Sequence, residues 1–404
     1  MHEIVIVGAG EAGGRAAIAL REGGYAGRLT LIGEEAQAPY ERPPLSKAAL
    51  VDPDEPRPTT ISGGERLAEL DVARIAAVVA ALEPADRRVA LADGRRLGYD
   101  ALILATGARA RALRLPGGEH ALTLRSFDDA QRLRARLRAA TRVVVIGGGF
   151  IGLELAAAAR ALGREVTVLE ADTRLLRRST PEPLASALEA RHARAGVEIA
   201  KGVRIERIEP RGRGFVVHSS LGEREADLVV AGIGAEPRTE LAAAAGLAVD
   251  NGIVVDGQLR TRDPQILAVG DCANFPHPLY PGRRLRLEAW RHAFDSGAHA
   301  AAALLGADDA YAAPPWFWSD QYDLTLQMVG LTEAGATTVQ RDLADGATML
   351  FHLDGDGRLV AAGGLGTIER IGKEIKLAER LIGRRATPSP AALADPGANL
   401  KKLI

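Results

Sequence analysis

The clearest pattern in the chain is a short apolar run that leads into glycines, and it occurs twice. The first apolar run, residues 4–7, leads into G-x-G-x-x-G at 8–13 and an alanine-rich segment, 15–20, expected to be helical. The second, residues 143–146, leads into G-G-G-F-I-G at 147–152 and another alanine-rich segment. Strand, glycine turn and helix in this order are typical of a dinucleotide-binding unit.

Each copy continues to a second predicted strand that ends in an acid. Residues 29–33 end at Glu34 and residues 165–169 end at Glu170, where a carboxylate can accept from a ribose hydroxyl. One such fingerprint can be a chance glycine-rich turn, but two complete copies are hard to obtain by accident. We therefore predict two dinucleotides, FAD and a nicotinamide nucleotide.

The pattern between and after the fingerprints predicts further elements. Residues 72–79 are predicted to be a strand, and Asp93-Gly94 is predicted to close a hairpin of 89–92 with 95–97. Buried strands with glycine turns are expected over 99–107 and 227–237. Ser126 is a candidate N-cap for a helix to residue 139, whose basic side is interpreted as a solvated face.

The C-terminal part alternates like an antiparallel sheet followed by a helix. Strands are predicted over 324–329, 337–340, 348–353 and 358–362. An amphipathic helix is predicted over 369–382, and its apolar face is expected to pack on that sheet. The members of this face are Ile371, Ile375, Ala378 and Ile382.

Composition excludes several function classes. The 404 residues suffice for two or three domains, and the net charge of -1 favours neither nucleic acid nor membrane as a partner. No apolar run is long enough to span a bilayer, and Met1 is followed at once by a strand, so no signal peptide is expected. Cys272 is the single cysteine, which fits a reducing, cytoplasmic location. No metal site is predicted.

Three other segments carry candidate chemistry, each with an alternative. Paired prolines fix Arg42 and Lys47 along a rigid loop, which is either a cofactor loop or a solvated surface loop. Asp271 ends a predicted strand, where it can accept from ribityl hydroxyls or only form a turn. Trp316 and Trp318 belong to an aromatic cluster, for which one interpretation is a hydrophobic contact between domains, and the other, a nicotinamide entrance, is what the family resemblance described next implies.

The motifs together resemble one family. In order they are GxGxxG, RPPLSK, ATG, GGGFIGLE, a Gly-x-Gly turn, VGDCA, LEAW and WFWSDQYDLTLQMVG. This order resembles the NADH-dependent ferredoxin reductases of the putidaredoxin reductase and biphenyl-dioxygenase ferredoxin reductase family. The resemblance implies an α/β, glutathione-reductase-like fold with two Rossmann-type nucleotide-binding domains and a C-terminal α+β domain. The implied FAD domain is 1–107 with 240–313, the NAD domain is 108–239, and the last domain is 314–404.

The resemblance also implies site residues. Lys47 and Glu154 correspond to the family's buried pair beside the flavin. The residues implied for FAD are Gly8, Gly10, Ala12, Gly13, Glu34, Arg42, Lys47, Val79, Ala105, Gly107, Arg125, Asp271 and Trp290. Those implied for NADH are Gly147, Gly149, Phe150, Ile151, Gly152, Glu170, Gly232, Ile233, Gly234 and Trp316.

The implied activity passes electrons from NADH through FAD, one at a time, to a [2Fe-2S] ferredoxin that serves a haem monooxygenase or Rieske dioxygenase. The redox cysteines of disulfide reductases, peroxidases and oxidases are missing, and Cys272 is predicted to be a buried filler. A rubredoxin reductase, an NADH-binding flavoprotein of apoptosis-inducing-factor type and an NADH oxidase remain alternatives. We expect a monomer or weak homodimer and a transient complex with an acidic ferredoxin. Its candidate docking residues are Arg283, Arg284, Arg286, Arg291, Arg370 and Lys373.

Overall fold

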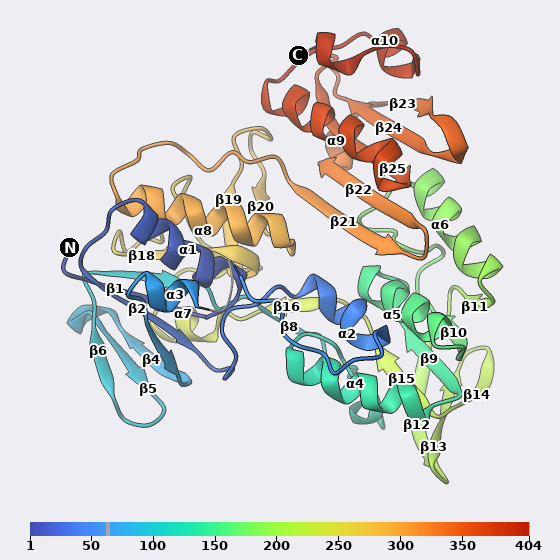
Figure 1. Cartoon of the computed structure of the whole chain (residues 1–404), viewed down its shortest axis with the longest axis horizontal. Coiled ribbons are helices and arrows are strands. Elements are labelled where there is room, and N and C mark those ends of the chain that lie inside the picture. Colours follow the sequence, from blue (N-terminus) through green and yellow to red (C-terminus); the bar gives the residue numbers. More distant parts are fainter. Residues whose placement is uncertain (62–64, 404) are drawn as a thin grey trace. The chain divides into compact units, whose positions relative to one another are not determined.

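The computed structural model describes residues 1–61 and 65–403, which form two compact units (Figure 1). The first unit comprises Met1–Glu41, Pro58–Arg109 and Glu236–Pro315. The second comprises Arg42–Arg57, Ala110–Ala235 and Trp316–Ile404. Each unit contains one of the two predicted fingerprints, and the boundaries of the three predicted domains stay a prediction.

A five-stranded parallel sheet forms the centre of the first unit, in the order β18-β7-β1-β2-β3. Helices α1 (Glu11–Glu22) and α8 (Trp290–Leu304) lie side by side in the first unit. A Cβ on Gly297 of α8 would come within 2.4 Å of the Ala12 carbonyl oxygen, so this glycine permits the close approach. The strands are β1 (Glu3–Val7), β2 (Arg28–Gly33), β3 (Ala73–Ala76), β7 (Ala101–Leu104) and β18 (Ile266–Ala268).

The single strand predicted over 72–79 is wrong, because the structure divides it between two sheets. Strand β3 joins the parallel sheet beside β2 and ends at Ala76. Val79 begins β4 (Val79–Glu83), which pairs antiparallel with β5 (Arg88–Leu91), and β5 pairs with β6 (Arg96–Gly98). The predicted Asp93-Gly94 turn joins β5 to β6, with Gly94 at a φ of +89°.

Smaller elements complete the first unit. One further sheet has the order β17-β19-β20, and short helices lie between the larger elements. These elements are α3 (Arg66–Glu69), η2 (Pro84–Asp86), α7 (Glu240–Ala244), β17 (Ile253–Val254), η4 (Gly270–Cys272), β19 (Ala273–Pro276) and β20 (Arg284–Leu285). Strands β8 (Ala108–Ala110) and β16 (Ala235–Pro237) pair where the chain passes between the units.

A four-stranded parallel sheet, ordered β11-β10-β9-β15, forms the nucleotide-binding part of the second unit. An antiparallel sheet of β12, β13 and β14 belongs to the same part. The strands are β9 (Arg142–Ile146), β10 (Glu165–Leu169), β11 (Val197–Ala200), β12 (Ile205–Arg211), β13 (Gly214–Ser219), β14 (Gly222–Ala226) and β15 (Leu228–Ala231). The helices are η1 (Pro43–Ser46), α2 (Ala48–Val51), η3 (Gly118–His120), α4 (Phe127–Ala139), α5 (Phe150–Ala161) and α6 (Glu182–Arg194).

Helix α4 confirms its predicted cap and corrects its predicted face. The Ser126 hydroxyl accepts from the Asp129 N–H, and the Asp129 carboxylate accepts from the Ser126 N–H, which completes a capping box. The prediction of a wholly solvated basic face is wrong at Arg134, which is buried. Its guanidinium donates to four carbonyl oxygens just beyond Lys47, those of Ala49, Leu50, Pro53 and Asp54.

The C-terminal part of the second unit is an antiparallel sheet in the order β21-β22-β25-β24-β23. Helix α9 (Ile368–Gly383) packs on β25 and β22 through its predicted apolar face, which is fully buried. Strand β21 was not predicted. The strands are β21 (Trp316–Gln321), β22 (Leu324–Gly330), β23 (Thr337–Asp342), β24 (Thr348–Leu353) and β25 (Leu359–Gly366). Shorter helices are η5 (Thr332–Ala334), η6 (Ala344–Gly346), α10 (Pro390–Ala394) and η7 (Leu400–Leu403).

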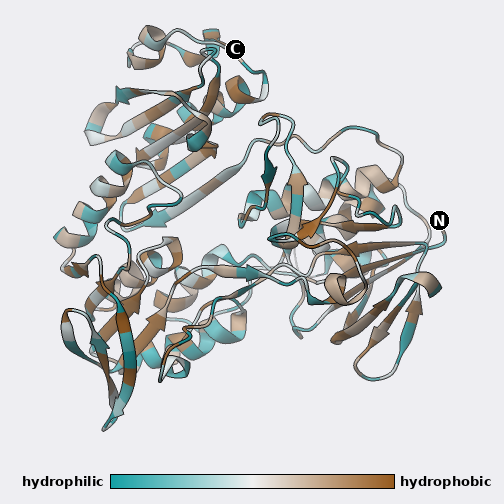
Figure 2. Ribbon diagram, turned by 180° about the vertical axis from the view of Figure 1, so that it is seen from behind, coloured by the Kyte–Doolittle hydropathy of each residue, from teal (hydrophilic) through white to brown (hydrophobic). Residues whose placement is uncertain are grey.

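Hydrophobic residues follow the central strands, whereas the helices carry both kinds of residue (Figure 2). Strand β7 is buried at every position, and so is β15. Strands buried on both faces are typical of parallel sheets covered by helices. None of the helices in the described part of the chain has both the length and the apolar character that a membrane span requires.

Candidate functional site

The glycines of the first fingerprint have two different physical roles. A Cβ on Gly8, whose φ is +113°, would lie 2.0 Å from the Ala105 carbonyl oxygen, and one on Gly13 would lie 1.9 Å from that of Gly8. Packing therefore requires glycine at both positions. At Gly10, by contrast, a Cβ would meet no atom within 4 Å among the described residues beyond Gly10 itself and its chain neighbours. The open space is at the N-terminus of α1, where backbone N–H groups favour a diphosphate.

The second fingerprint repeats this division. A Cβ on Gly147, whose φ is +104°, would lie 2.6 Å from the Gly232 oxygen, and one on Gly152 would lie 2.0 Å from the Gly147 oxygen. At Gly149 the nearest atom is 3.7 Å away. Ile151, in the first turn of α5, leaves 42% of its surface exposed beside this opening. Both cradles fit a dinucleotide by the same test.

The two acids that follow the fingerprints have different partners. Glu34 forms an ion pair with Arg238, whose backbone N–H donates to the Gly107 oxygen at 2.9 Å. Glu170 instead accepts two backbone N–H bonds, from Gly148 at 2.5 Å and from Asp172 at 2.6 Å. Glu170 therefore holds the second glycine loop itself. Arg238 was not among the predicted site residues, because its link to Glu34 joins segments far apart in sequence.

Glu11 is a second residue that the sequence interpretation missed. It begins α1 inside the first fingerprint, and its Oε2 is buried without a hydrogen-bond partner among the residues that the structure describes. Burial, and then the nearby Glu41 carboxylate, raise the pKa of Glu11 to about 7, while Trp290 and Arg15 oppose the shift. A protonated Glu11 does not repel a diphosphate, so it is compatible with the cradle. The sequence feature that could have identified Glu11 is an acidic residue inside the glycine motif.

Lys47 and Glu154 form an ion pair in the second unit, in which the carboxylate is buried and 25% of the lysine side chain is exposed. The Lys47 Nζ lies 2.9 Å from Glu154 Oε1, and only 5% of the Glu154 side chain is exposed. The Ser46 hydroxyl donates to Glu154 Oε2, and the Ser319 hydroxyl donates to Oε1 at 2.6 Å. A buried carboxylate needs such donors, because an unpaired charge is costly away from water. The contacts of Arg134 hold the segment that directly follows Lys47.

The remaining predicted residues are distributed between the units. Asp271 is buried in η4, directly after β18, and Trp290 begins α8. In the first unit the structure also places Ala12 in α1, Val79 at the start of β4, and Ala105 and Gly107 after β7. Arg42, Lys47 and Arg125, predicted for FAD, lie in the second unit with the residues predicted for NADH. There Arg42 donates to the Arg125 carbonyl oxygen at 2.5 Å.

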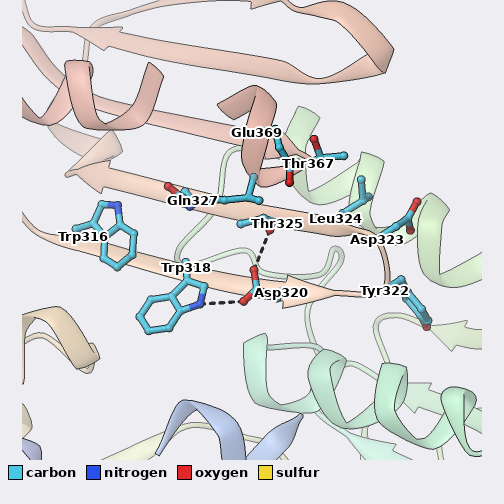
Figure 3. A pocket seen from close by; sticks show the side chains of 11 residues that line it. Trp316, Trp318, Asp320, Tyr322, Asp323, Leu324, Thr325, Gln327, Thr367 and Glu369 are labelled. Carbon is cyan, nitrogen blue, oxygen red and sulfur yellow. Dashed lines mark hydrogen bonds between the residues drawn. The ribbon is translucent and has the colours of Figure 1, made fainter. Parts of the chain in front are cut away.

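One face of β21 borders a pocket of about 590 Å³ (Figure 3). The rings of Trp316 and Trp318 stack there at a centroid distance of 5.2 Å. Asp320 accepts from Trp318 Nε1 at 3.0 Å and from the Thr325 hydroxyl at 2.8 Å. The other lining residues are Tyr322, Asp323, Leu324, Gln327, Thr367, Ile368 and Glu369. The pocket lining thus combines two stacked aromatic rings with the carboxylates of Asp320, Asp323 and Glu369.

Several arginines predicted for docking already have internal partners. Arg284 donates to the carbonyl oxygens of Val255 and Asn274 at 2.6 and 2.5 Å. Arg286 pairs with Glu288, Arg291 with Asp295 and Arg370 with Asp345. Their charge is partly compensated within the chain, so the exposed Lys373 becomes the sharper candidate for a docking test.

Cys272 confirms its predicted role as a filler. It is fully buried, and its thiol donates to the Val269 oxygen at 3.2 Å. Burial raises the pKa of the Cys272 thiol, which keeps it protonated and unreactive. In the described parts of the chain, no cluster of His, Cys, Asp and Glu is arranged to hold a metal ion.

Comparison with known proteins places these features in one family. Residues 2–297 match the model of the pyridine nucleotide-disulphide oxidoreductases, and residues 316–404 match the model named reductase C-terminal. The reductase component of the anthranilate 1,2-dioxygenase system of Burkholderia cepacia is 46% identical over 99% of this chain and 98% of its own. Putidaredoxin reductase of Pseudomonas putida is 39% identical, over 99% and 96%.

Solved structures agree over the whole length. The ferredoxin reductase for the CYP199A2 system of Rhodopseudomonas palustris has a TM-score of 0.94 at 37% identity, covering 100% of this chain and 99% of that one. The covalent putidaredoxin reductase–putidaredoxin complex gives a TM-score of 0.93 at 37% identity, over 100% and 98%. These values confirm the predicted glutathione-reductase-like α/β fold with a C-terminal domain. The chain belongs to the pyridine nucleotide-disulphide oxidoreductases and, within them, to the family of ferredoxin–NAD(+) reductases that includes putidaredoxin reductase.

Proposed function

We propose that this chain is an NADH-dependent ferredoxin reductase that passes electrons through FAD, singly, to a [2Fe-2S] ferredoxin of a haem monooxygenase or Rieske dioxygenase system. The observation that carries the proposal is the pair of cradles, each with an open middle glycine between two glycines required by packing. Two dinucleotide cradles in one chain are what transfer of electrons from NADH to FAD requires of the protein. FAD, when bound, supplies the conversion of a two-electron donor into one-electron steps.

The first cradle would hold FAD through Gly10, Ala12 and the N-terminus of α1. Asp271 would accept from ribityl hydroxyls. Glu34 would accept from a ribose hydroxyl, either by giving up its ion pair with Arg238 or by keeping that pair while it accepts a second bond. The second cradle would hold NADH through Gly149, Ile151 and Glu170. The support is the matching geometry of the two loops and the open space above each.

Lys47 and Glu154 are the residues we assign to the chemistry beside the flavin. The Lys47 ammonium would favour negative charge on the reduced ring by direct electrostatic attraction. Glu154 would keep that ammonium in place, because its carboxylate is buried, fully hydrogen-bonded and 2.9 Å from Nζ. Arg134 would act on Lys47 indirectly by fixing the following turn.

The acceptor is proposed to be another protein, since the chain's own thiol cannot serve. Cys272 is the single cysteine, and it is sealed in the core. Relatives are named as reductases of ferredoxins, and one solved relative is a complex with putidaredoxin. We propose an acidic ferredoxin in a transient complex with a basic surface around Lys373, a monomeric or weakly dimeric reductase, and a cytoplasmic location.

Anaerobic stopped-flow spectroscopy tests the proposal in two stages. NADH should bleach the flavin of the purified holoprotein within its turnover time. Addition of candidate [2Fe-2S] ferredoxins should then restore the oxidised spectrum. Rapid reoxidation by rubredoxin or by oxygen alone, with no response to any ferredoxin, would overturn the assignment. A long-lived charge-transfer complex with slow turnover would favour an NADH-binding flavoprotein instead.

The docking surface has its own test. Lys373→Glu should lower the rate with ferredoxin and leave the rate with ferricyanide unchanged, and added salt should slow only the ferredoxin reaction. Arg284→Glu is a poorer test, because it also removes hydrogen bonds to Val255 and Asn274. Arg204→Glu is the matched control, since Arg204 is a highly exposed arginine outside the predicted docking residues. Equal effects of Lys373→Glu and Arg204→Glu on the ferredoxin rate would exclude this surface.

A further inference from the structure

Strand β21 presents different chemistry on its two faces. Because side chains alternate along a strand, Trp316, Trp318 and Asp320 border the pocket (Figure 3). The residues between them point the other way, toward α5 and α6. Phe317 packs edge-on against Phe150 with ring centroids 4.9 Å apart, and Ser319 contacts Glu154. One strand therefore borders both the pocket and the buried ion pair.

From Ser319 a continuous chain of hydrogen bonds leads away from Glu154. Gln321 Nε2 lies 2.9 Å from the Ser319 Oγ, and Gln321 Oε1 lies 2.6 Å from His192 Nε2. His192 Nδ1 lies 3.0 Å from the Tyr322 hydroxyl. Glu154, Ser319, Gln321 and His192 are each no more than 5% exposed, so these bonds are shielded from water. Buried, fully satisfied bonds of this kind strengthen one another.

The carboxylate at one end fixes the direction of every bond. An ionised Glu154 can only accept, so Ser319 must donate its proton to it. Ser319 then accepts from the Gln321 amide, which leaves Gln321 Oε1 facing His192 as an acceptor. Nε2 of His192 must carry the proton, and Nδ1 accepts from Tyr322. Burial lowers the pKa of His192, which agrees with a neutral ring that has one donor and one acceptor.

We propose that Ser319, Gln321, His192 and Tyr322 form a one-directional donor chain that holds Glu154 as the buried anion opposite Lys47, and are therefore positioning residues for reduction by NADH. The proposal rests on the proposed function, since it assigns these residues to the same ion pair. Each bond supports the next, so the effect of a mutation must decline with its distance from Glu154 along the chain. A merely structural attachment of β21 to α5 and α6 predicts no such order.

The kinetic test is anaerobic reduction of the bound flavin by NADH, with no ferredoxin present. Ser319→Ala removes a hydrogen bond to a charged group and should slow flavin reduction by about tenfold, with less change in NADH affinity. Ser319→Thr keeps the hydroxyl and should restore the rate. Tyr322→Phe, at the far end, should slow it by less than about twofold. Thr338→Val is the matched control, because its hydroxyl bonds to His352 between β23 and β24.

A double-mutant cycle identifies the route of the effect. If Ser319 acts through Glu154, Ser319→Ala should cost little once Glu154→Gln is present. Equal losses in both backgrounds, or a Thr338→Val loss as large as that of Ser319→Ala, would overturn the proposal. So would a Tyr322→Phe loss that equals the Ser319→Ala loss.

A readout independent of activity is the tautomer of His192. Nitrogen NMR of the wild-type holoprotein should show a proton on Nε2 and none on Nδ1, and a proton on Nδ1 alone would overturn the donor chain. This result stands even if Ser319→Ala fails to fold. It also separates the two proposals, since a wild-type flavin that NADH cannot reduce would refute the function, whereas the tautomer would still decide the chain.

Discussion

The two glycine fingerprints have the same backbone arrangement, but the acid that follows each one has different hydrogen-bond partners. In both, the first and last glycines are required by packing and the middle one is open. The acid after the first copy, Glu34, pairs with the Arg238 side chain, whereas the acid after the second, Glu170, binds backbone N–H groups of its own unit's loop. The first helical residues also differ, since α1 begins with the half-buried Glu11 and α5 begins with Phe150.

We propose that this difference tunes the two cradles to different ligands. A long, exposed side chain pair such as Glu34–Arg238 can rearrange at small cost, because exposed ion pairs contribute little. Backbone bonds to Glu170 fix both the carboxylate and the glycine loop before a ligand arrives. Phe150 ties the second cradle to β21 through Phe317. The second copy is therefore the more preorganised, as suits a nucleotide that binds and leaves in each cycle.

The largest effects are expected from alanine at the last glycine of each fingerprint, and they should differ between the two copies. Gly13→Ala places a Cβ 1.9 Å from a backbone oxygen and should destabilise the first unit by about 3 kcal/mol or more, with loss of FAD. Gly152→Ala meets the same obstacle at 2.0 Å in the second unit. We expect that variant to keep its yellow colour and lose reduction by NADH. Flavin absorbance and thermal melting measure both, and loss of FAD from Gly152→Ala would show that the cradles are not independent.

The next effect is a pH dependence that only the first copy should show. The pKa of Glu11 is raised from its ordinary 4.5 to about 7, so the folded protein retains a proton that the unfolded chain releases. The stability contributed is complete below about pH 4.5 and is lost as the pH rises to about 7. Relative to Glu11→Gln, the wild type should thus lose about 3 kcal/mol across this window.

Denaturant unfolding at several pH values measures that difference. Glu69→Gln is the control, because Glu69 is 60% exposed. A constant difference between wild type and Glu11→Gln from pH 4.5 to 7 would mean that Glu11 titrates normally.

Local patterns predicted both cradles, because each depends on glycines and an acid at fixed spacing. The elements that the sequence did not predict depend on distant partners. Strand β21 lacks alternation of apolar and polar residues, since one face borders a pocket and the other carries a buried polar chain. Ser319 meets Glu154 across 165 residues, and Arg134 meets the Ala49 carbonyl across 85. The Lys47–Glu154 pair was expected from family resemblance alone, since no spacing indicates it.

A smaller effect is expected for Glu170, and it concerns the choice of nucleotide. The wild type should prefer NADH strongly, because a 2′-phosphate would meet the Glu170 carboxylate. Of the two arginines just downstream that would weaken this preference, Arg174 is already bonded to the Thr180 oxygen. The Arg178 guanidinium lies near Gly234, 3.6 Å from where a Cβ on that glycine would be. Glu170→Ala should lower kcat/KM for NADH by about tenfold, since charge-assisted bonds to the glycine loop are lost. It should leave kcat/KM for NADPH nearly unchanged, because relief of the repulsion offsets the same loss.

Steady-state kinetics with both nucleotides measure whether Glu170→Ala reduces the difference in kcat/KM between NADH and NADPH. Equal wild-type efficiency with NADH and NADPH would refute the role of Glu170. A rise with NADPH as large as the fall with NADH would show that repulsion, and not loop preorganisation, is the main contribution of this acid.

The smallest effect should come from removing the partner of Glu34, the acid of the first copy. This variant tests most directly whether the first cradle is less preorganised than the second. Arg238→Ala removes the ion pair to Glu34 but keeps the backbone bonds of residue 238, which join it to Gly107 and to the Thr106 hydroxyl. Because the pair is exposed, we expect a loss of less than about 1 kcal/mol in stability. FAD affinity should rise slightly or stay constant, since Glu34 no longer has to leave a partner before it accepts from a ribose. Titration of the apoprotein with FAD measures this affinity. A large loss of FAD would mean that Arg238 binds the cofactor itself and that the first cradle is as preorganised as the second.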